Sequence, residues 1–290
     1  GGRLEVAIER VVWQTESGVQ TCPVIALFET TSRFPEMTRQ GRRSTSPMAS
    51  ESISRSGARW PMPFKDFALV AFDHVGTTES TRQYFLKHQS RYLGLEGYVD
   101  DFIEVCSALA PRDPGILVGH SLGAMVGLLA SLKKPALFSK LVLIGASPCY
   151  MNKGDYRGGL ENGDVDAIYR AIHEDYAGWA RSFAASVMGN PDRPQLARLF
   201  AATVASIPRE MMLTVLCSIL QQDHRESVDR VTTPTLIIQS QSDPFVPGGV
   251  AEYLHQHITG SVLAEIEATG HLPHVSAPDA VIKAIRDFVC

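Results

Sequence analysis

The chain has no pair of cysteines at C-x-x-C spacing, and its five cysteines are scattered along 290 residues. An odd number of unclustered thiols argues against a disulfide framework and favours a reducing compartment. The sequence also lacks an apolar run as long as a membrane span, and the first five residues lack the apolar core of a signal peptide. Basic residues are not in surplus, since the net charge is −4. We therefore expect a cytoplasmic protein that binds neither nucleic acid nor a membrane.

Apolar runs that predict strands alternate with stretches of helical spacing. The predicted strands are a weak edge strand over 4–13 and stronger runs over 24–28, 67–73, 116–119, 141–144, 235–239 and 262–266. Helical spacing covers 95–109 and 280–289. This alternation predicts an α/β fold with a mainly parallel central sheet and helices on both faces.

Two segments depart from this alternation. Residues 30–59 are polar and without periodicity, so we expect them to be irregular. Residues from about 150 to 222 carry four helical segments and no convincing strand, which is typical of a helical cap inserted between strands. The predicted organisation is therefore a core over 1–148, a helical lid over 149–222 and the rest of the core over 223–290.

The segment Gly119–Gly123, which reads Gly-His-Ser-Leu-Gly, places a serine between an apolar run and a helical stretch. Glycines flank this serine, as a sharp strand-to-helix turn requires where the chain passes close to itself. Such a turn holds the serine hydroxyl clear of the sheet, and the next helix directs free backbone N–H groups to the same point. Ser121 is therefore the candidate nucleophile, and the backbone N–H of Leu122 is the candidate oxyanion donor.

A serine hydroxyl needs a base to activate it, and the base needs an orienting acid. Where the serine stands on such a turn, the acid and then the histidine follow it along the chain. Asp243 follows the predicted strand 235–239, and His271 follows the predicted strand 262–266. Because the carboxyl ends of parallel strands meet at one edge of a sheet, we expect these side chains to reach Ser121. His271 would take the serine proton and later protonate the leaving group, while Asp243 would orient the imidazole.

Two rival residues fit these roles less well. Asp73 also ends a predicted strand, but it precedes the serine and so fits the expected order badly. His274 is a second histidine in the same segment, but only His271 is preceded by a glycine that permits a tight approach.

Other side chains are candidates for the pocket. We expect His120 to line the pocket floor, with a packed neutral imidazole as the alternative. Trp179 and Phe183 lie in the helical block, where they form either its own core or the roof of an apolar substrate pocket. The pair Asp100-Asp101 is interpreted as a solvated helix face.

Several short segments after Phe67 have the amino-acid sequence that is typical of one family. They are Arg91-Tyr92, 95–98, 119–125, 137–141, 145–152, 155–159, 223–225 and 270–274. In these segments the chain resembles a subgroup of the α/β-hydrolases that contains the RsbQ-like stress-signalling hydrolases of bacteria and the karrikin and strigolactone receptors of plants. The wording of Ser147–Tyr150 is closer to the bacterial members.

The resemblance implies an α/β-hydrolase fold with a V-shaped four-helix lid over an apolar pocket. It also implies hydrolysis of a small apolar ester, lactone or enol ether by Ser121, Asp243 and His271, without a cofactor or a metal. The alternative that it implies is a ligand-sensing module with slow hydrolysis and a signalling protein partner at the lid.

One family motif is missing. Members of the family carry His-Gly-Phe-Gly after an early strand, and this loop supplies a second oxyanion N–H. Here the strand 24–28 runs into Glu29–Phe34, and no His-Gly occurs before Gly119. The sequence therefore predicts either a substitute backbone N–H near Glu29 or Thr30, or an oxyanion hole with a single donor.

Overall fold

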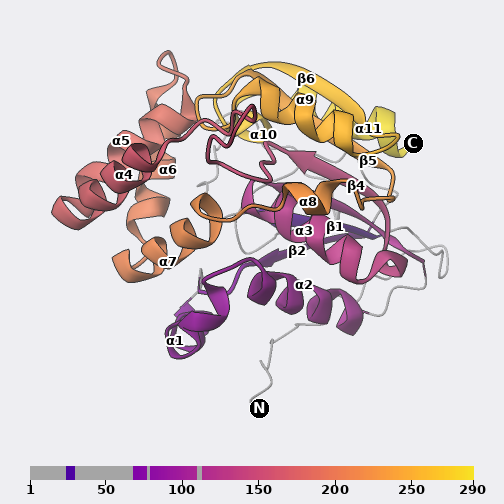
Figure 1. Ribbon diagram of the computed structural model, residues 1–290, viewed down its shortest axis with the longest axis horizontal. Coiled ribbons are helices and arrows are strands. Elements are labelled where there is room, and N and C mark those ends of the chain that lie inside the picture. The colour runs from indigo at the N-terminus through magenta and orange to yellow at the C-terminus, as the bar shows by residue number, and fades with distance from the viewer. Residues whose placement is uncertain (1–23, 30–67, 77–78, 110–112) are drawn as a thin grey trace, which may run out of the picture.

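The computed structural model describes residues 24–29, 68–76, 79–109 and 113–290, and for the first two strands it describes the backbone alone (Figure 1). The predicted edge strand over 4–13 and the predicted irregular segment over 30–59 lie outside these residues.

The strands of the described chain form one six-stranded sheet in the order β2-β1-β3-β4-β5-β6, and every neighbouring pair is parallel. They are β1 (Val24–Glu29), β2 (Ala68–Asp73), β3 (Gly115–His120), β4 (Phe138–Ile144), β5 (Thr235–Ser242) and β6 (Val262–Thr269). The strand order reverses between β1 and β3, because the chain places β2 on one side of β1 and β3 on the other. Ligand sites in open parallel sheets form at the carboxyl ends of the strands beside such a reversal.

Helices cover both faces of the sheet (Figure 1). The described helices of the core are α1 (Glu79–Lys87), α2 (Glu96–Leu109), α3 (Leu122–Lys133), α8 (Arg225–Val228), α9 (Gly248–His257), α10 (Pro273–Ser276) and α11 (Pro278–Val289), with short 3-10 turns at Gln89–Tyr92 and Pro135–Leu137. Alternate side chains of β3 enter two apolar clusters: Leu117 packs with α2, α3 and α9, whereas Ile116 and Val118 pack with α11. Because β3 is buried on both faces, its sequence is almost continuously apolar, which is why this strand was predictable.

Between β4 and β5 this part of the structure carries the consecutive helices α4 (Asn162–Glu174), α5 (Tyr176–Met188), α6 (Pro194–Ala205) and α7 (Arg209–Leu220), which we call the helical insertion. It lies to one side of the sheet in Figure 1. Its apolar side chains, among them Trp179 and Leu216, pack with Tyr150 and Val246 from the loops that follow β4 and β5. The insertion therefore covers the carboxyl ends of these strands, while the domain limits at 149 and 222 and the lid function stay predictions.

The two ends of the insertion meet. Cys149 and Asp223 form an isolated antiparallel bridge, and the backbone N–H of His224 donates to the carbonyl of Pro148 at 2.8 Å. Among the described residues, no single helix is long and apolar enough to cross a membrane. Of the described helices, only α6 and α7 taken together reach such a length and apolar character, and the chain bends by 105° between them.

Candidate active site

Ser121 stands on a strained turn between β3 and α3. Its backbone has φ 52° and ψ −115°, and among the described residues it is the single non-glycine with a positive φ. Such a conformation costs about 1–3 kcal/mol and persists only where the surroundings impose it. A Cβ on Gly119 would stand 2.6 Å from the carbonyl oxygen of Gly123, so the predicted close passage of the chain requires glycine there.

The neighbouring strand and the next helix fix this turn. The N–H of Ser121 donates to the carbonyl of Ile144 at the end of β4, at 2.9 Å. Leu122 begins α3, and the first N–H groups of a helix have no intrahelical acceptor and carry partial positive charge. The end of β1 also lies here, since Phe28 pairs with Gly119. Thr30, one of the positions suggested for a second donor, lies outside the described residues.

Asp243 follows β5 directly, and His271 stands two residues after β6. Nδ1 of His271 lies 2.8 Å from Oδ2 of Asp243, and both side chains are nearly inaccessible to solvent. The other carboxylate oxygen, Oδ1, accepts the backbone N–H groups of Phe245 and Val246 at 2.8 and 2.9 Å. Both oxygens are therefore held, and the carboxylate has one orientation toward the imidazole.

The charge of Asp243 follows from a balance of effects. Burial by itself raises the pKa of the carboxyl, but the hydrogen bond and the charge at His271, with the two backbone donors, outweigh burial and hold the pKa below its usual range. Asp243 is therefore a carboxylate at neutral pH, which is the state that can orient an Nδ1–H group and stabilise an imidazolium.

Ser121 and His271 both contact the turn after β4, and no hydrogen bond joins the Ser121 hydroxyl to the His271 ring. Ile144 accepts the Ser121 N–H, and a Cβ on the next residue, Gly145, would stand 3.0 Å from Cε1 of His271. Gly145 has φ +56° and gives the ring its room. Nε2 of His271 is buried and has no hydrogen-bond partner among the described residues. The Ser121 Oγ instead lies 3.5 Å from the hydroxyl of Tyr150.

The other two histidines of the site pack behind His271. Nε2 of His120 lies 2.8 Å from the backbone carbonyl of His271, and the His120 ring lies 4.7 Å from the ring of His271 and 4.6 Å from that of His274. Burial lowers the pKa of His120 well below its ordinary value, with a further contribution from the other two rings, so it is neutral. Burial likewise lowers the pKa of His274 to about 4. Between the rival histidines, it is His271 that meets Asp243.

A row of aromatic rings leads from the insertion to His271. Trp179 stacks on Phe183 with 5.0 Å between the ring centres, Phe183 meets Phe245 edge-on at 5.7 Å, and Phe245 meets His271 edge-on at 5.2 Å. Trp179 also belongs to the apolar core of the insertion. Both of its suggested roles are thus compatible with its position, and a pocket role for Trp179 and Phe183 stays a prediction.

Sequence reasoning missed Tyr150 and Phe245 as neighbours of the site. Tyr150 follows β4, the strand beside β3, and Phe245 comes two residues after Asp243. Their place in loops at the carboxyl ends of strands was the available signal. Asp101 corrects a further prediction: it is buried and accepts hydrogen bonds from Arg91 at 2.7 Å and Tyr92 at 2.8 Å, so it does not lie on a solvated face. Asp100 is exposed as expected.

Within the described part of the chain, no group of three or more His, Cys, Asp or Glu side chains is arranged to hold an ion.

Comparison with known proteins places the chain in a family. The model of the alpha/beta hydrolase family matches residues 46–284. A karrikin insensitive 2 receptor of Petunia hybrida is 39% identical over 221 residues, which is 76% of this chain and 81% of the relative. A strigolactone esterase of Arabidopsis thaliana is 35% identical over 223 residues, or 77% of this chain and 82% of the relative.

The structural comparison agrees with this assignment. The structure of a hydrolase from Oleispira antarctica superposes with a TM-score of 0.78 at 25% identity, covering 93% of this chain and 92% of that one. The family match, the two relatives and the shared architecture confirm the predicted α/β-hydrolase fold and the predicted hydrolase class. The chain therefore belongs to the alpha/beta hydrolase family, in the part of it that includes karrikin receptors and strigolactone esterases.

Proposed function

We propose that this protein is a serine hydrolase that cleaves a small apolar ester, lactone or enol ether through Ser121, His271 and Asp243. One observation carries the proposal. The imidazole of His271 is held at Nδ1 by a buried carboxylate, while its other nitrogen, Nε2, is buried and has no partner among the described residues. The ring packs beside Gly145 and beside the ring of His120, the residue before Ser121. A buried nitrogen without a partner costs free energy, and such a cost is typical of a functional group.

The reaction follows from these positions. The Ser121 Oγ attacks the carbonyl carbon of the ester, and Nε2 of His271 takes the hydroxyl proton while Asp243 stabilises the imidazolium. The oxyanion forms near the first turn of α3, where the N–H of Leu122 donates to it. Collapse of the intermediate breaks the bond to the leaving alkoxide, which takes the proton from His271 and leaves an acyl-serine. A water molecule, deprotonated by the same nitrogen, then attacks the acyl carbon; the bond to Ser121 Oγ breaks, Oγ takes the proton back from His271, and the acid is released.

The surroundings favour an apolar substrate. Trp179 and Phe183 of the insertion and Phe245 beside His271 present aromatic surface, and sites for small ligands are mainly apolar with a few polar groups. The relatives named as a karrikin receptor and a strigolactone esterase also support a small molecule as the substrate. The described cysteines Cys106, Cys149, Cys217 and Cys290 are free thiols, which supports the cytoplasmic location expected from the sequence.

A fluorophosphonate probe tests this proposal directly, because it reacts only with an activated serine. We expect covalent labelling of the wild-type protein and none of the Ser121→Ala variant, together with hydrolysis of p-nitrophenyl acetate that the variant loses. Ser131→Ala serves as the matched control, because Ser131 lies on the same helix α3 and donates only to the backbone of Leu128. A folded wild-type protein that is not labelled would refute the proposal.

A second function is favoured by the relative that is named as a receptor. In this alternative, the protein senses a butenolide-like ligand, hydrolyses it slowly and presents the insertion to a signalling protein partner. A ligand that raises the melting temperature while turnover stays near zero would support sensing. Repeated rapid turnover of the same ligand would support the hydrolase alone.

A further inference from the structure

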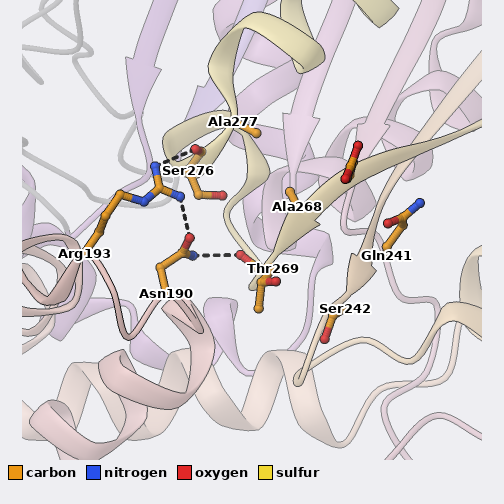
Figure 2. A pocket seen from close by; sticks show the side chains of 9 residues that line it. Asn190, Arg193, Gln241, Ser242, Ala268, Thr269, Ser276 and Ala277 are labelled. Atoms are coloured by element: carbon orange, nitrogen blue, oxygen red, sulfur yellow. Dashed lines mark hydrogen bonds between the residues drawn. The ribbon is translucent and has the colours of Figure 1, made fainter.

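The loop that follows α5 is joined by hydrogen bonds to the segment that carries His271. The Nδ2 of Asn190 donates to the carbonyl of Thr269 at 2.8 Å, and Nη1 of Arg193 donates to the carbonyl of Ser276, also at 2.8 Å. The other terminal nitrogen of Arg193, Nη2, donates to Oδ1 of Asn190. Figure 2 shows this arrangement, in which the two side chains reach across from the insertion and hold each other between the two contacts.

The end of α5 itself is bonded to His271. The last carbonyls of a helix have no intrahelical partner. Here the carbonyl of Val187 accepts the backbone N–H of His271 at 2.8 Å, and the carbonyl of Met188 accepts Nδ2 of Asn190 at 2.5 Å. The backbone N–H of His271, the residue proposed as the base, therefore caps the end of α5.

The two segments approach so closely that glycine is required on one side. Gly270 has φ +100°, and a Cβ there would stand 2.0 Å from the carbonyl oxygen of Met188. Val187 and Met188 are buried in a small apolar cluster with Leu272. Backbone hydrogen bonds, apolar packing and side-chain hydrogen bonds thus meet in one contact region, which we call the joint. The residues on either side of His271 form the part of the joint that belongs to the core.

A polar cavity of about 300 Å³ adjoins the joint (Figure 2). Asn190 and Arg193 line it from the insertion, and Ser242 and Thr269 line it from the core. These last two residues lie just before Asp243 and His271 in the chain, and the N–H of Gly270 donates to the carbonyl of Ser242 at 2.7 Å. Beside this space, the hydrogen bonds from Asn190 and Arg193 restrain the loop at Thr269 and Ser276.

We infer that Asn190 and Arg193 are positioning residues for His271: by tying Thr269 and Ser276 to the end of α5, they hold the histidine loop so that Nε2 stays within reach of Ser121. Neither side chain touches the reacting atoms. The inference rests on the proposed function of His271 as the base. A displacement of about 1 Å in a catalytic group can cost on the order of 100-fold in rate, so a restraint at this joint affects catalysis more than folding.

The first experiment measures the position of His271 without catalysis. In the Ser121→Ala background, the proton between His271 Nδ1 and Asp243 gives a downfield proton resonance in NMR, identified by its loss in His271→Ala. We expect Arg193→Gln and Asn190→Ala to broaden or shift this resonance. Arg198→Gln and Gln195→Ala, which alter exposed residues of α6, leave it unchanged. A resonance that is unchanged in both joint variants overturns the inference.

The second experiment measures hydrolysis of p-nitrophenyl acetate by proteins that retain Ser121. We expect kcat to fall about 10- to 100-fold in Arg193→Gln and Asn190→Ala. KM and the fraction of labelled active sites should stay within about twofold of the wild type, because the pocket and the fold are intact. Arg193→Lys keeps a donor for Ser276 but loses the second donor, which Arg193 gives to Asn190. Its kcat should therefore lie between those of the wild type and Arg193→Gln. This variant also decides the outcome if Arg193→Gln does not fold.

The possible failures are distinguishable. A fall in rate that is matched by an equal fall in labelled sites indicates unfolding, and it overturns the positioning role. A wild-type protein without hydrolysis or labelling refutes the proposed function instead, and the resonance experiment then still decides whether Asn190 and Arg193 position His271.

Discussion

Nδ1 of His271 lies 2.8 Å from Oδ2 of Asp243, and only 4% and 1% of these two side chains is exposed. Water cannot replace the carboxylate at such a buried place, so Asp243 alone supplies the hydrogen bond that orients the imidazole at Nδ1. If the two residues act as proposed, replacing the acid by its amide allows the wrong tautomer of the imidazole and removes the charge that stabilises the imidazolium.

Asp243→Asn should therefore lower kcat for p-nitrophenyl acetate by roughly 10³- to 10⁴-fold, with little change in KM. Steady-state kinetics measure this effect. Asp229→Asn is the matched control, because it alters an exposed aspartate next to the short helix α8. A loss smaller than about tenfold would remove Asp243 from the proposed machinery.

The hydroxyl of Tyr150 lies 3.5 Å from Ser121 Oγ, and burial raises the pKa of this phenol well above its ordinary value. The phenol is therefore protonated at neutral pH and can donate to charge that develops beside the serine. We expect Tyr150→Phe to lower kcat by about 2- to 10-fold, the size of one neutral hydrogen bond. Labelling rates with the fluorophosphonate probe should fall in parallel, and an unchanged rate would show that the phenol plays no part in acylation.

Gly270→Ala should destabilise the protein strongly. The new methyl group would meet the carbonyl oxygen of Met188 at 2.0 Å, and φ +100° is unfavourable for any residue with a side chain. Strain and steric overlap together give about 2–4 kcal/mol of lost unfolding free energy. Urea denaturation measures it, with Gly260→Ala as the control.

That control separates the two causes. Gly260 has φ +72°, but a Cβ there would meet no atom within 4 Å, so the substitution introduces conformational strain alone. A Gly270 variant no less stable than the Gly260 variant would mean that the joint between α5 and the histidine loop relaxes freely.

The stability of the protein should fall as the pH is lowered from about 6.5 toward 4. Burial lowers the pKa of His274 to about 4 in the folded protein, while the unfolded chain keeps an ordinary histidine. Between these two values the unfolded state binds more protons, so this contribution to stability is complete above the unfolded pKa and is lost as the pH falls toward the folded one. His120, whose pKa burial also lowers, acts in the same direction.

His274→Phe removes one of these titrating groups. We expect its melting temperature to depend less steeply on pH in this window than that of the wild type. His173→Phe, a substitution in the last turn of α4, should keep the wild-type slope. Equal slopes for wild type and His274→Phe would contradict the assignment.

The parts of this site that depend on local sequence were predictable. The turn at Ser121 follows from an apolar strand, two flanking glycines and an apolar helix, all within about fifteen neighbouring residues. Asp243 and His271 could be chosen because a parallel sheet brings strand ends to one edge, whatever their separation along the chain.

Contacts between distant loops were not predictable in this way. The approach of Tyr150 to Ser121 and the bonds from Asn190 and Arg193 to the histidine loop depend on how the insertion packs, and no periodicity encodes that packing. The prediction for Asp101 was wrong for a related reason. Its partners Arg91 and Tyr92 precede α2 in the chain, and the sequence of the helix alone did not show that they bury this side chain. The helix α1 (Glu79–Lys87) was missed because its composition is mostly polar.

The bridge between Cys149 and Asp223 has a consequence for how this chain can change. Paired residues of neighbouring strands stand only about 5 Å apart, so the stretch from 150 to 222 leaves the core and returns to it at two adjacent residues. Changes of length inside this stretch therefore need not move the ends of β4 and β5, because the chain departs and returns at one point beside them. Substrate choice can therefore diversify in this stretch wherever the bonds from Val187, Asn190 and Arg193 to the histidine loop are kept.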